Sequence, residues 1–193
     1  MGRKWLSAVG ILVLGGLLSA QTAPARKPAV NQDSLVLKDF EDRVTAYEKL
    51  LKKTKAEVPV PKQTLSASKI QSRRTEIRSE VRAARGSQKQ GQIFTPEIGR
   101  VFRKVLAETL SGPEGSRIRT SLRDTKPEKG IVLKVNQPYP EKVPVQTTPP
   151  TLLLNLPKLP KELEYRIVGR TLVLRDIATN LVVDFLPDAL PSS

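Results

Sequence analysis

Residues 151–186 read TLLLNLPKLPKELEYRIVGRTLVLRDIATNLVVDFL, and this is the only part of the chain dense enough in branched apolar residues to form a sheet. Three short segments within it alternate apolar and polar residues, which is the period-two pattern of strands with one buried face. Short turns at 168–170 and 176–180 separate the segments. The sequence therefore predicts a three-stranded antiparallel meander. Its expected inward-facing residues are Leu163, Tyr165, Ile167, Leu172, Leu174, Leu181, Val183 and Phe185.

The composition predicts a small core and excludes several kinds of chemistry. A chain of 193 residues is long enough for one modest domain with tails, and its 16 Pro and few aromatic residues leave little to bury. There is no Cys and no His. This removes disulfide bridges, thiolate and imidazole metal ligands, Cys nucleophiles and Ser-His or Cys-His pairs. We expect no cofactor, no metal site and no catalytic residue.

The N-terminus has the order of an export signal. Arg3 and Lys4 precede an apolar run at residues 8–18, and small residues follow at 18–20. The run is about half the roughly twenty residues that a bilayer span needs, so we predict a signal peptide at 1–20 and no stable membrane span after cleavage. A retained anchor is the alternative. The expected location is exported, either periplasmic or secreted in a bacterium, with a flexible leader at 21–32.

Residues 33–91 are predicted to form two helices. The first begins near Asp33 or Ser34 and carries its apolar residues at steps of three and four, namely Leu37, Phe40, Val44, Tyr47 and Leu51. The second covers 64–85 with a thinner apolar line of Ile70, Ile77, Val81 and Ala84, and we expect it to be loosely attached. A further interpretation is that the two helices form a coiled-coil arm through which the protein oligomerises, because the first helix keeps its three-four spacing across two heptads.

Residues 92–190 are expected to form the compact part. Thr95 and Pro96 open a helix at its cap and first turn, and the apolar face that follows is the widest in the chain. We therefore expect this helix to cover the sheet. The alternation at 131–136 predicts one more strand, and the run of Leu at 151–156 suggests a buried one. The predicted fold class is α+β, with N-terminal helices followed by a small antiparallel sheet that one helix packs on.

The positive charge is concentrated on the second helix. The whole chain has a formal net charge of +14, and residues 62–91 hold eight Lys or Arg against two Glu. A solvated helix face with some pairing to Glu76 and Glu80 explains such a run without any ligand. The alternative is a contact with an anionic polymer, since closely spaced arginines create a field that phosphates and carboxylates feel. The candidate contacts are Arg73, Arg74, Arg78, Arg82 and Arg85.

Two catalytic motifs are conceivable without His, and both have structural explanations. Carboxylate pairs are available as Glu162 with Glu164 or Asp176 with Asp184, but the first pair sits on an outward strand face and Asp176 suits a turn. Residues 66–69, SASK, match the spacing of an SxxK motif. The other motifs that accompany SxxK in penicillin-binding enzymes are missing, so we treat the match as chance.

Nucleic acid is not the expected partner despite the basic composition. Aromatic residues for base stacking are scarce, no nucleic-acid motif is present, and the export signal directs the chain away from the cytosol. In a bacterial envelope the abundant anions are lipid headgroups, lipopolysaccharide phosphates and acidic wall polymers. An envelope protein or one of these anionic polymers is the expected partner.

Two resemblances concern the C-terminal half. The motifs FTPEIGRVF, LSGPEGSRIRTSLRD, VNQPYP and NLVVDFLP, in this order, resemble a family of uncharacterised exported bacterial proteins, which implies no activity. The segment LEYRIVGRTLVLRDIATNLVVDF is similar to the C-terminal hairpin of the periplasmic RcnB-like family, which is linked to nickel and cobalt homeostasis. This chain has Asn180 where that family tends to have Gly, and it lacks His, so metal handling is not carried over. The second resemblance implies a small extracytoplasmic meander used as a docking surface.

These observations predict a non-enzymatic exported protein of the envelope or periplasm that binds a protein or an anionic polymer. A hydrolase or transferase that uses carboxylates alone is one alternative. An oligomerising structural protein that associates through its N-terminal helices is another.

Overall fold

The chain is an α+β protein in which helices precede a small antiparallel sheet, as predicted. The computed structural model describes residues 31–60, 66–124, 131–140 and 148–191. The predicted signal peptide and nearly all of the leader lie outside these residues. The elements are α1 (Gln32–Glu57), α2 (Ala67–Arg85), α3 (Pro96–Ser111), α4 (Gly115–Asp124), α5 (Pro150–Leu153), β1 (Leu163–Val168), β2 (Thr171–Asp176) and β3 (Leu181–Leu186).

The sheet is the predicted meander, with strand order β1-β2-β3 and both pairs antiparallel. A two-residue turn at 169–170 joins β1 to β2, and Gly169 has a φ of 61°, the left-handed conformation such a turn requires. Asn180, before β3, has a φ of 59°, which Asn tolerates better than most residues.

β3 departs from simple alternation because one residue is bulged. Leu174 pairs with Asp184 and the next residue, Arg175, pairs with Val182, so Val183 is the extra residue in β3. The bulge moves the following residues to the opposite face, because side chains alternate along a strand. The prediction that Phe185 faces inward with Leu181 and Val183 was therefore wrong. Phe185 instead packs on the outer face of the sheet, against a small apolar cluster that includes Val173 and Val182.

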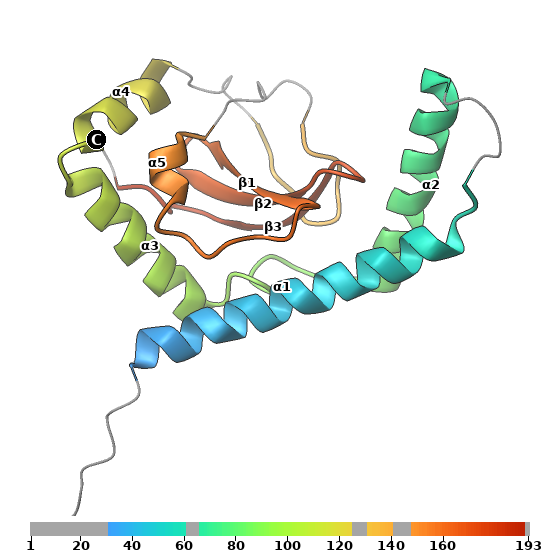
Figure 1. Ribbon diagram of the computed structural model, residues 1–193, viewed down its shortest axis with the longest axis horizontal. Coiled ribbons are helices and arrows are strands. Elements are labelled where there is room, and N and C mark those ends of the chain that lie inside the picture. Colours follow the sequence, from blue (N-terminus) through green and yellow to red (C-terminus); the bar gives the residue numbers. More distant parts are fainter. Residues whose placement is uncertain (1–30, 61–65, 125–130, 141–147, 192–193) are drawn as a thin grey trace, which may run out of the picture.

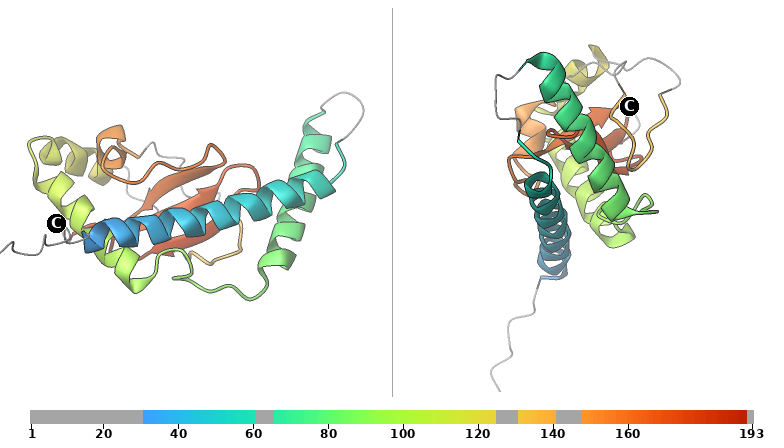
Figure 2. Two further views of the ribbon diagram at one scale, coloured as in Figure 1. Left: turned by 60° about the horizontal axis from the view of Figure 1, so that its bottom comes forward. Right: turned by 90° about the vertical axis from the view of Figure 1, so that its right-hand side faces the viewer.

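α1 lies along the inner face of the sheet, as Figure 1 and the left view of Figure 2 show. Its predicted apolar stripe is confirmed, with Phe40, Val44, Tyr47 and Leu51 all buried. The helix begins earlier than predicted, because the side chain of Asn31, not that of Asp33 or Ser34, accepts a hydrogen bond from the amide of Asp33.

α3 covers the sheet together with α1, so two helices rather than one pack there. Thr95 caps it and Pro96 occupies its first turn, as predicted. The rings of Phe40, Phe94, Phe102 and Tyr165 meet between α1, α3 and β1, with centroids 4.8–6.5 Å apart. One hydrophobic cluster thus contains residues from α1, α3 and all three strands. It crosses the boundary that the sequence predicted between the two N-terminal helices at 33–91 and the compact part at 92–190.

α2 stands at one end of the molecule (Figure 1) and adds little to this core. Its Ile77 and Val81 are buried, which at about 1.5–3 kcal/mol for each side chain is a modest apolar attachment. The prediction for its other apolar positions was wrong. Ile70 is 49% exposed, and Ala84 is exposed while its neighbour Arg85 is buried.

Two predicted strands are not strands. Residues 131–135 form no strand, and only residues 136–139 run beside β3, with a single bridge between Pro138 and Leu181. Asn136 adopts a φ of 63° and Pro138 has no amide to donate, which prevents a longer ladder. The run of Leu at 151–156 contains the short helix α5 and turns. Residues 131–140 instead cover the outer face of the sheet, where Tyr139 packs in a cluster with Val168, Val173 and Val182.

Candidate functional site

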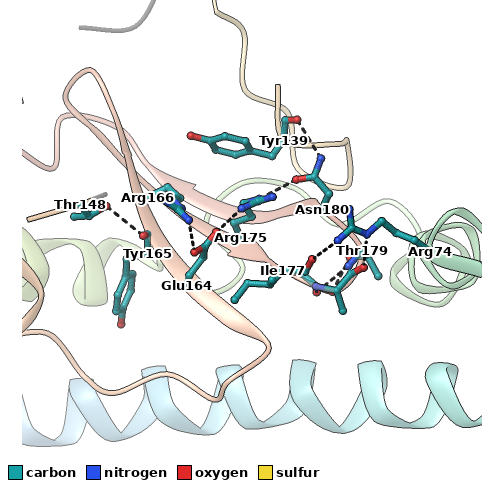
Figure 3. A network of polar contacts seen from close by, with 12 residues as sticks. Arg74, Tyr139, Thr148, Glu164, Tyr165, Arg166, Arg175, Ile177, Thr179 and Asn180 are labelled. Carbon is teal, nitrogen blue, oxygen red and sulfur yellow. Dashed lines mark hydrogen bonds and ion pairs between the residues drawn. The ribbon is translucent and has the colours of Figure 1, made fainter. Parts of the chain in front are cut away.

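The arginines of α2 mostly bind carbonyl oxygens of the protein itself. Arg74 donates from Nε to the carbonyl oxygen of Ala178 at 3.0 Å and from Nη2 to that of Ile177 at 3.3 Å. Arg78 donates to the carbonyl of Thr179 at 2.9 Å. Figure 3 shows Arg74 reaching from α2 to this turn between β2 and β3. These two arginines therefore attach α2 to the sheet.

Arg73 serves the connection between α1 and α2 in the same way. It donates to the carbonyls of Lys55, Val58 and Pro59 at 3.2–3.4 Å. These carbonyls lie at the end of α1 and just beyond it, where the helix leaves acceptors unpaired. Arg73 satisfies them, and its cationic head suits the negative end of the helix dipole.

Arg85 is the buried member of the set, with 8% of its surface exposed. Its Nη2 donates to the carbonyl of Val183 at 2.8 Å, and its guanidinium lies 5.2 Å from the ring centroid of Tyr47. Burial lowers the pKa of Arg85, although the nearby Tyr47, Asp184 and Asp176 oppose this. Arg85 closes the α2 end of the core and does not face an external anion.

Arg82 is different, because it is exposed and no described residue accepts a hydrogen bond from its guanidinium or forms an ion pair with it. It lines an open hollow of about 540 Å³ at the C-terminal end of α2. The other lining residues come from α2, the loop after it and the segment beside β3, and they are Ser79, Ala83, Gly86, Ser87, Gln88, Val135, Asn136 and Gln137. The lining offers hydroxyl and amide groups and one cation, but no carboxylate.

Asn136 supplies the buried polar group of this hollow. It is 8% exposed, its Nδ2 donates to the carbonyl of Gly86 at 3.2 Å, and its backbone amide donates to the carbonyl of Val182 at 3.0 Å. Its Oδ1 is buried and accepts no hydrogen bond. This oxygen has almost no accessible surface, so it is out of reach of a molecule in the hollow.

The acidic residues considered as catalytic pairs are bound by other groups. Asp184 accepts hydrogen bonds from the amides of Gly91, Ile93, Phe94 and Phe185 at 2.7–3.0 Å. Asp176 accepts from Tyr47, Ala178 and Thr179. The two are not cross-strand neighbours, since Asp176 opposes Leu181 and Asp184 opposes Leu174. Each carboxylate therefore has a structural task.

Glu164 is held between two arginines on the outer face of the sheet (Figure 3). Arg166 lies 2.6 Å from one of its oxygens, and Arg175 binds the other oxygen. Arg175 also donates to Asn180 at 2.8 Å and lies 5.1 Å from the ring centroid of Tyr139. This network holds Tyr139 against the sheet through its ring and its carbonyl oxygen. Glu162, the other member of the predicted pair, precedes β1 and is not part of the network.

The SxxK match has a structural origin. The side chain of Ser66 is the N-cap of α2 and accepts a hydrogen bond from the amide of Lys69 at 3.4 Å. A Ser at the cap with its partner three residues later is the ordinary geometry of a helix start.

A separate apolar groove lies beside the edge strand β1, between this strand and the segment that contains α5. It has a volume of about 480 Å³, and its walls include Leu153, Leu156, Leu159 and Tyr165. Leu154, which also lines it, is 78% exposed and is the most exposed large apolar side chain in the described part of the chain.

Two further searches of the structure were negative. Within residues 31–60, 66–124, 131–140 and 148–191, no three Asp or Glu side chains gather closely enough to hold a metal ion. None of the helices described here combines the length and the apolar character that crossing a bilayer takes.

Comparison with protein-family models, with curated proteins and with solved structures finds no match for this chain. Of the five arginines predicted from sequence, the structure brings Arg74, Arg78 and Arg85 to the sheet and Arg73 to the end of α1, and it places only Arg82 in a polar hollow. Asn136 was not predicted as a site residue. Its one sequence signal was its position before Gln137 and Pro138, at the end of an alternating run.

Proposed function

We propose that this chain is a non-enzymatic exported protein that binds an anionic polymer of the bacterial envelope, with Arg82 as its principal contact. The observation that carries the proposal is the contrast within α2. Four arginines use their guanidinium groups on carbonyls of the protein, whereas Arg82 has no partner among the described residues and lines a polar hollow. A guanidinium in that position has donors available for a phosphate or carboxylate.

The charge of the chain supports a polymer rather than a single small anion. The formal net charge is +14, and exposed Lys and Arg side chains occur on α1, α2 and α3. Such a field attracts a polyanion from a distance of about one Debye length, roughly 8–10 Å at physiological salt, and a long ligand gains from several weak contacts at once. Arg82 would then fix one unit of the polymer.

A binding role also fits the side chains that the protein contains. The chain has no His and no Cys, and the buried carboxylates Asp176 and Asp184 accept hydrogen bonds from backbone amides and hydroxyls of the protein. These carboxylates are therefore already used to hold the fold, and neither is free to exchange a proton with a substrate.

The proposal is tested by measuring the affinity of the purified chain for long-chain polyphosphate, which stands in for the phosphate polymers of an envelope. Arg82→Gln should weaken binding about tenfold, because a charge-assisted hydrogen bond to the anion is lost. The matched control is Arg117→Gln, which removes the same charge from α4 at a side chain that is 85% exposed.

The control should change the affinity less than about twofold, and the wild-type affinity should fall as salt rises from 50 to 300 mM. If Arg82→Gln and Arg117→Gln weaken binding equally, the net charge alone attracts the polymer and Arg82 is not the contact. Binding that does not respond to salt would contradict the electrostatic basis of the proposal.

A further inference from the structure

We infer that the apolar groove beside β1 binds a single-chain amphiphile, a molecule with one acyl chain and one anionic head. This site is separate from the hollow with Arg82, and binding there goes beyond the proposed function. The groove has a volume of about 480 Å³, which lies within the roughly 300–1,000 Å³ that is common for small-molecule sites. Its large apolar lining residues are Leu153, Leu154, Leu156, Leu159, Leu163 and Tyr165.

The groove exists before any ligand binds, because hydrogen bonds hold both of its walls. The hydroxyl of Tyr165 on β1 donates to the carbonyl of Pro157 at 3.1 Å and so joins the two walls. The wall opposite β1 is fastened to α3 through Asn155, whose Nδ2 donates to the hydroxyl of Thr109 at 2.9 Å, and α5 packs against the same helix. A ligand can therefore enter without first ordering these residues.

The edge of β1 is not open to a further strand, so the occupant is not an extended peptide. The amide of Leu163 already donates to the carbonyl of Pro160 at 2.9 Å. The carbonyl of Tyr165 already accepts from the hydroxyl of Thr148 at 3.3 Å, as Figure 3 shows. A strand that paired with β1 would have to break both bonds.

The groove suits a hydrocarbon chain, because most polar side chains of its lining are already bonded within the protein. The hydroxyls of Thr148 and Tyr165 donate to backbone carbonyls. The two carboxylate oxygens of Glu164 are bound, one by Arg166 and the other by Arg175. A polar atom of a ligand placed among these groups would lose its bonds to water without gaining new ones.

Lys158 supplies the charge that selects the head group. It is exposed at the groove, and no residue in the described part of the chain forms an ion pair with it. Because two arginines already neutralise Glu164, the charge that remains at the groove is positive. An anionic head beside Lys158 is therefore favoured over a cationic one, while the chain lies on the leucines.

The occupant is a single molecule from solution and not a bilayer surface. Leu154 is 78% exposed, and it is the one lining leucine that is exposed. Leu156 and Leu163 are only 6% and 5% exposed, so a flat membrane would reach Leu154 and miss them. A chain that enters the groove can lie against all three.

The first test measures the affinity of the full chain for octanoate and decanoate by calorimetry, at concentrations below micelle formation. Each buried methylene should tighten binding about fourfold, so decanoate should bind at least about tenfold more tightly than octanoate. Decyltrimethylammonium has the same chain with a cationic head and should bind at least about fivefold more weakly than decanoate. An affinity independent of chain length would mean that charge alone attracts the anion, and it would overturn the inference.

Two variants locate the binding site without disturbing the fold, since both side chains are exposed. Leu154→Ser should weaken decanoate about fivefold by removing apolar contact, and Lys158→Gln about threefold by removing the charge. The matched controls are Val132→Ser, at a side chain that is 69% exposed, and Lys134→Gln, and neither residue lines the groove. Both controls should stay within about 1.5-fold. Losses of equal size in variants and controls would contradict the inference.

Two further measurements separate this site from a membrane surface and from the polymer site. Binding to phosphatidylglycerol vesicles that Leu154→Ser weakens, without any binding of monomeric decanoate, would assign Leu154 to a bilayer and overturn the inference. Arg82→Gln should leave the affinity for decanoate within about 1.5-fold, because Arg82 lines the hollow and not the groove. A larger loss would place decanoate in the hollow and would also overturn it.

Discussion

Asp184 shows how much a single buried side chain contributes to this fold. It is fully buried on β3 and accepts hydrogen bonds from the amides of Gly91, Ile93 and Phe94, which lie in the loop between α2 and α3. One carboxylate thereby satisfies three amides that the loop would otherwise bury without partners, and it fixes where α3 begins.

Asp184→Asn should therefore destabilise the protein by about 3 kcal/mol, because the new amide group faces backbone donors and leaves at least one of them unpaired. Chemical denaturation at pH 7 measures the difference. The control is Asp42→Asn on α1, where the carboxylate is 64% exposed and pairs with Lys38, and it should change the stability by less than about 0.5 kcal/mol. Similar effects in the two variants would show that Asp184 does not organise the loop.

Tyr47 gives the protein an alkaline limit. Burial and then the charge of Asp176 raise the pKa of Tyr47 well above its ordinary value of 10.0, and its hydroxyl donates to Asp176 at 2.7 Å. Above pH 10 the unfolded chain loses this proton while the folded chain keeps it. The folded state thus binds more protons, so the stability is complete below pH 10 and falls above it, by about 1.4 kcal/mol per pH unit for this tyrosine.

Tyr47→Phe should remove that part of the slope of unfolding free energy between pH 10 and 11. At pH 7 it should cost about 1–2 kcal/mol for the lost hydrogen bond to Asp176. Denaturation series at several pH values check both. An unchanged alkaline slope in the variant would mean that Tyr47 titrates in the folded protein as it does in the unfolded chain.

At the scale of the elements, α2 depends more on polar contacts than on apolar ones. It buries Ile77 and Val81, and it reaches the turn between β2 and β3 through Arg74 and Arg78. Removing both guanidinium groups should release α2 while the sheet remains folded. In the double variant Arg74→Gln, Arg78→Gln we expect amide hydrogens of α2 to exchange about tenfold faster, and those of β2 to be unaffected.

Residue-resolved hydrogen exchange measures these rates. Arg117→Gln is the control, because it also replaces an arginine with glutamine but lies on α4, away from α2. Faster exchange in β2 as well would mean that α2 and the sheet unfold together. No change in α2 would mean that its apolar residues alone hold it.

The elements that the sequence predicted correctly are those whose pattern is local. The alternation at 163–167 and the spacing of Phe40, Val44, Tyr47 and Leu51 record one buried face directly, so the meander and the first helix could be predicted. The bulge at Val183 could not, because it depends on how β3 pairs with β2. The strand expected at 131–136 failed for a similar reason: an alternating segment can also cover a sheet without joining it.

In the candidate site, too, contacts between residues close in sequence could be predicted, whereas contacts between distant residues could not. The turn role of Asp176 was predictable, since it accepts from amides two and three residues ahead. The hydrogen bonds of Asp184 span about 90 residues, and those of Arg74 and Arg78 span more than 100. Charge density on α2 therefore pointed to five arginines of equal standing, and only their distant partners separate Arg82 from the others.

The whole molecule is a sheet with helices on its inner face and an irregular segment on its outer face. α1 and α3 bury the inner face in the main core, and residues 131–140 cover the outer face and continue to the hollow beside α2. The apolar stripe of α1, which suggested a coiled coil, lies in that core. The hollow with Arg82 and Asn136 thus forms where the three parts of the molecule meet: α2, the outer segment and the loop that leads to α3.

The central claim is that an anionic ligand binds at this one junction, although positive charge is spread over the whole molecule. The test must therefore report on the whole surface at once. We would record the backbone amide signals of the uniformly labelled chain while adding long-chain polyphosphate at physiological salt. The structure predicts that the largest shifts cluster at residues 82–88 and 135–137, with small ones on α1, α3 and α4. Shifts spread over the exposed lysines and arginines of those helices, with none concentrated at the end of α2, would contradict a built binding site.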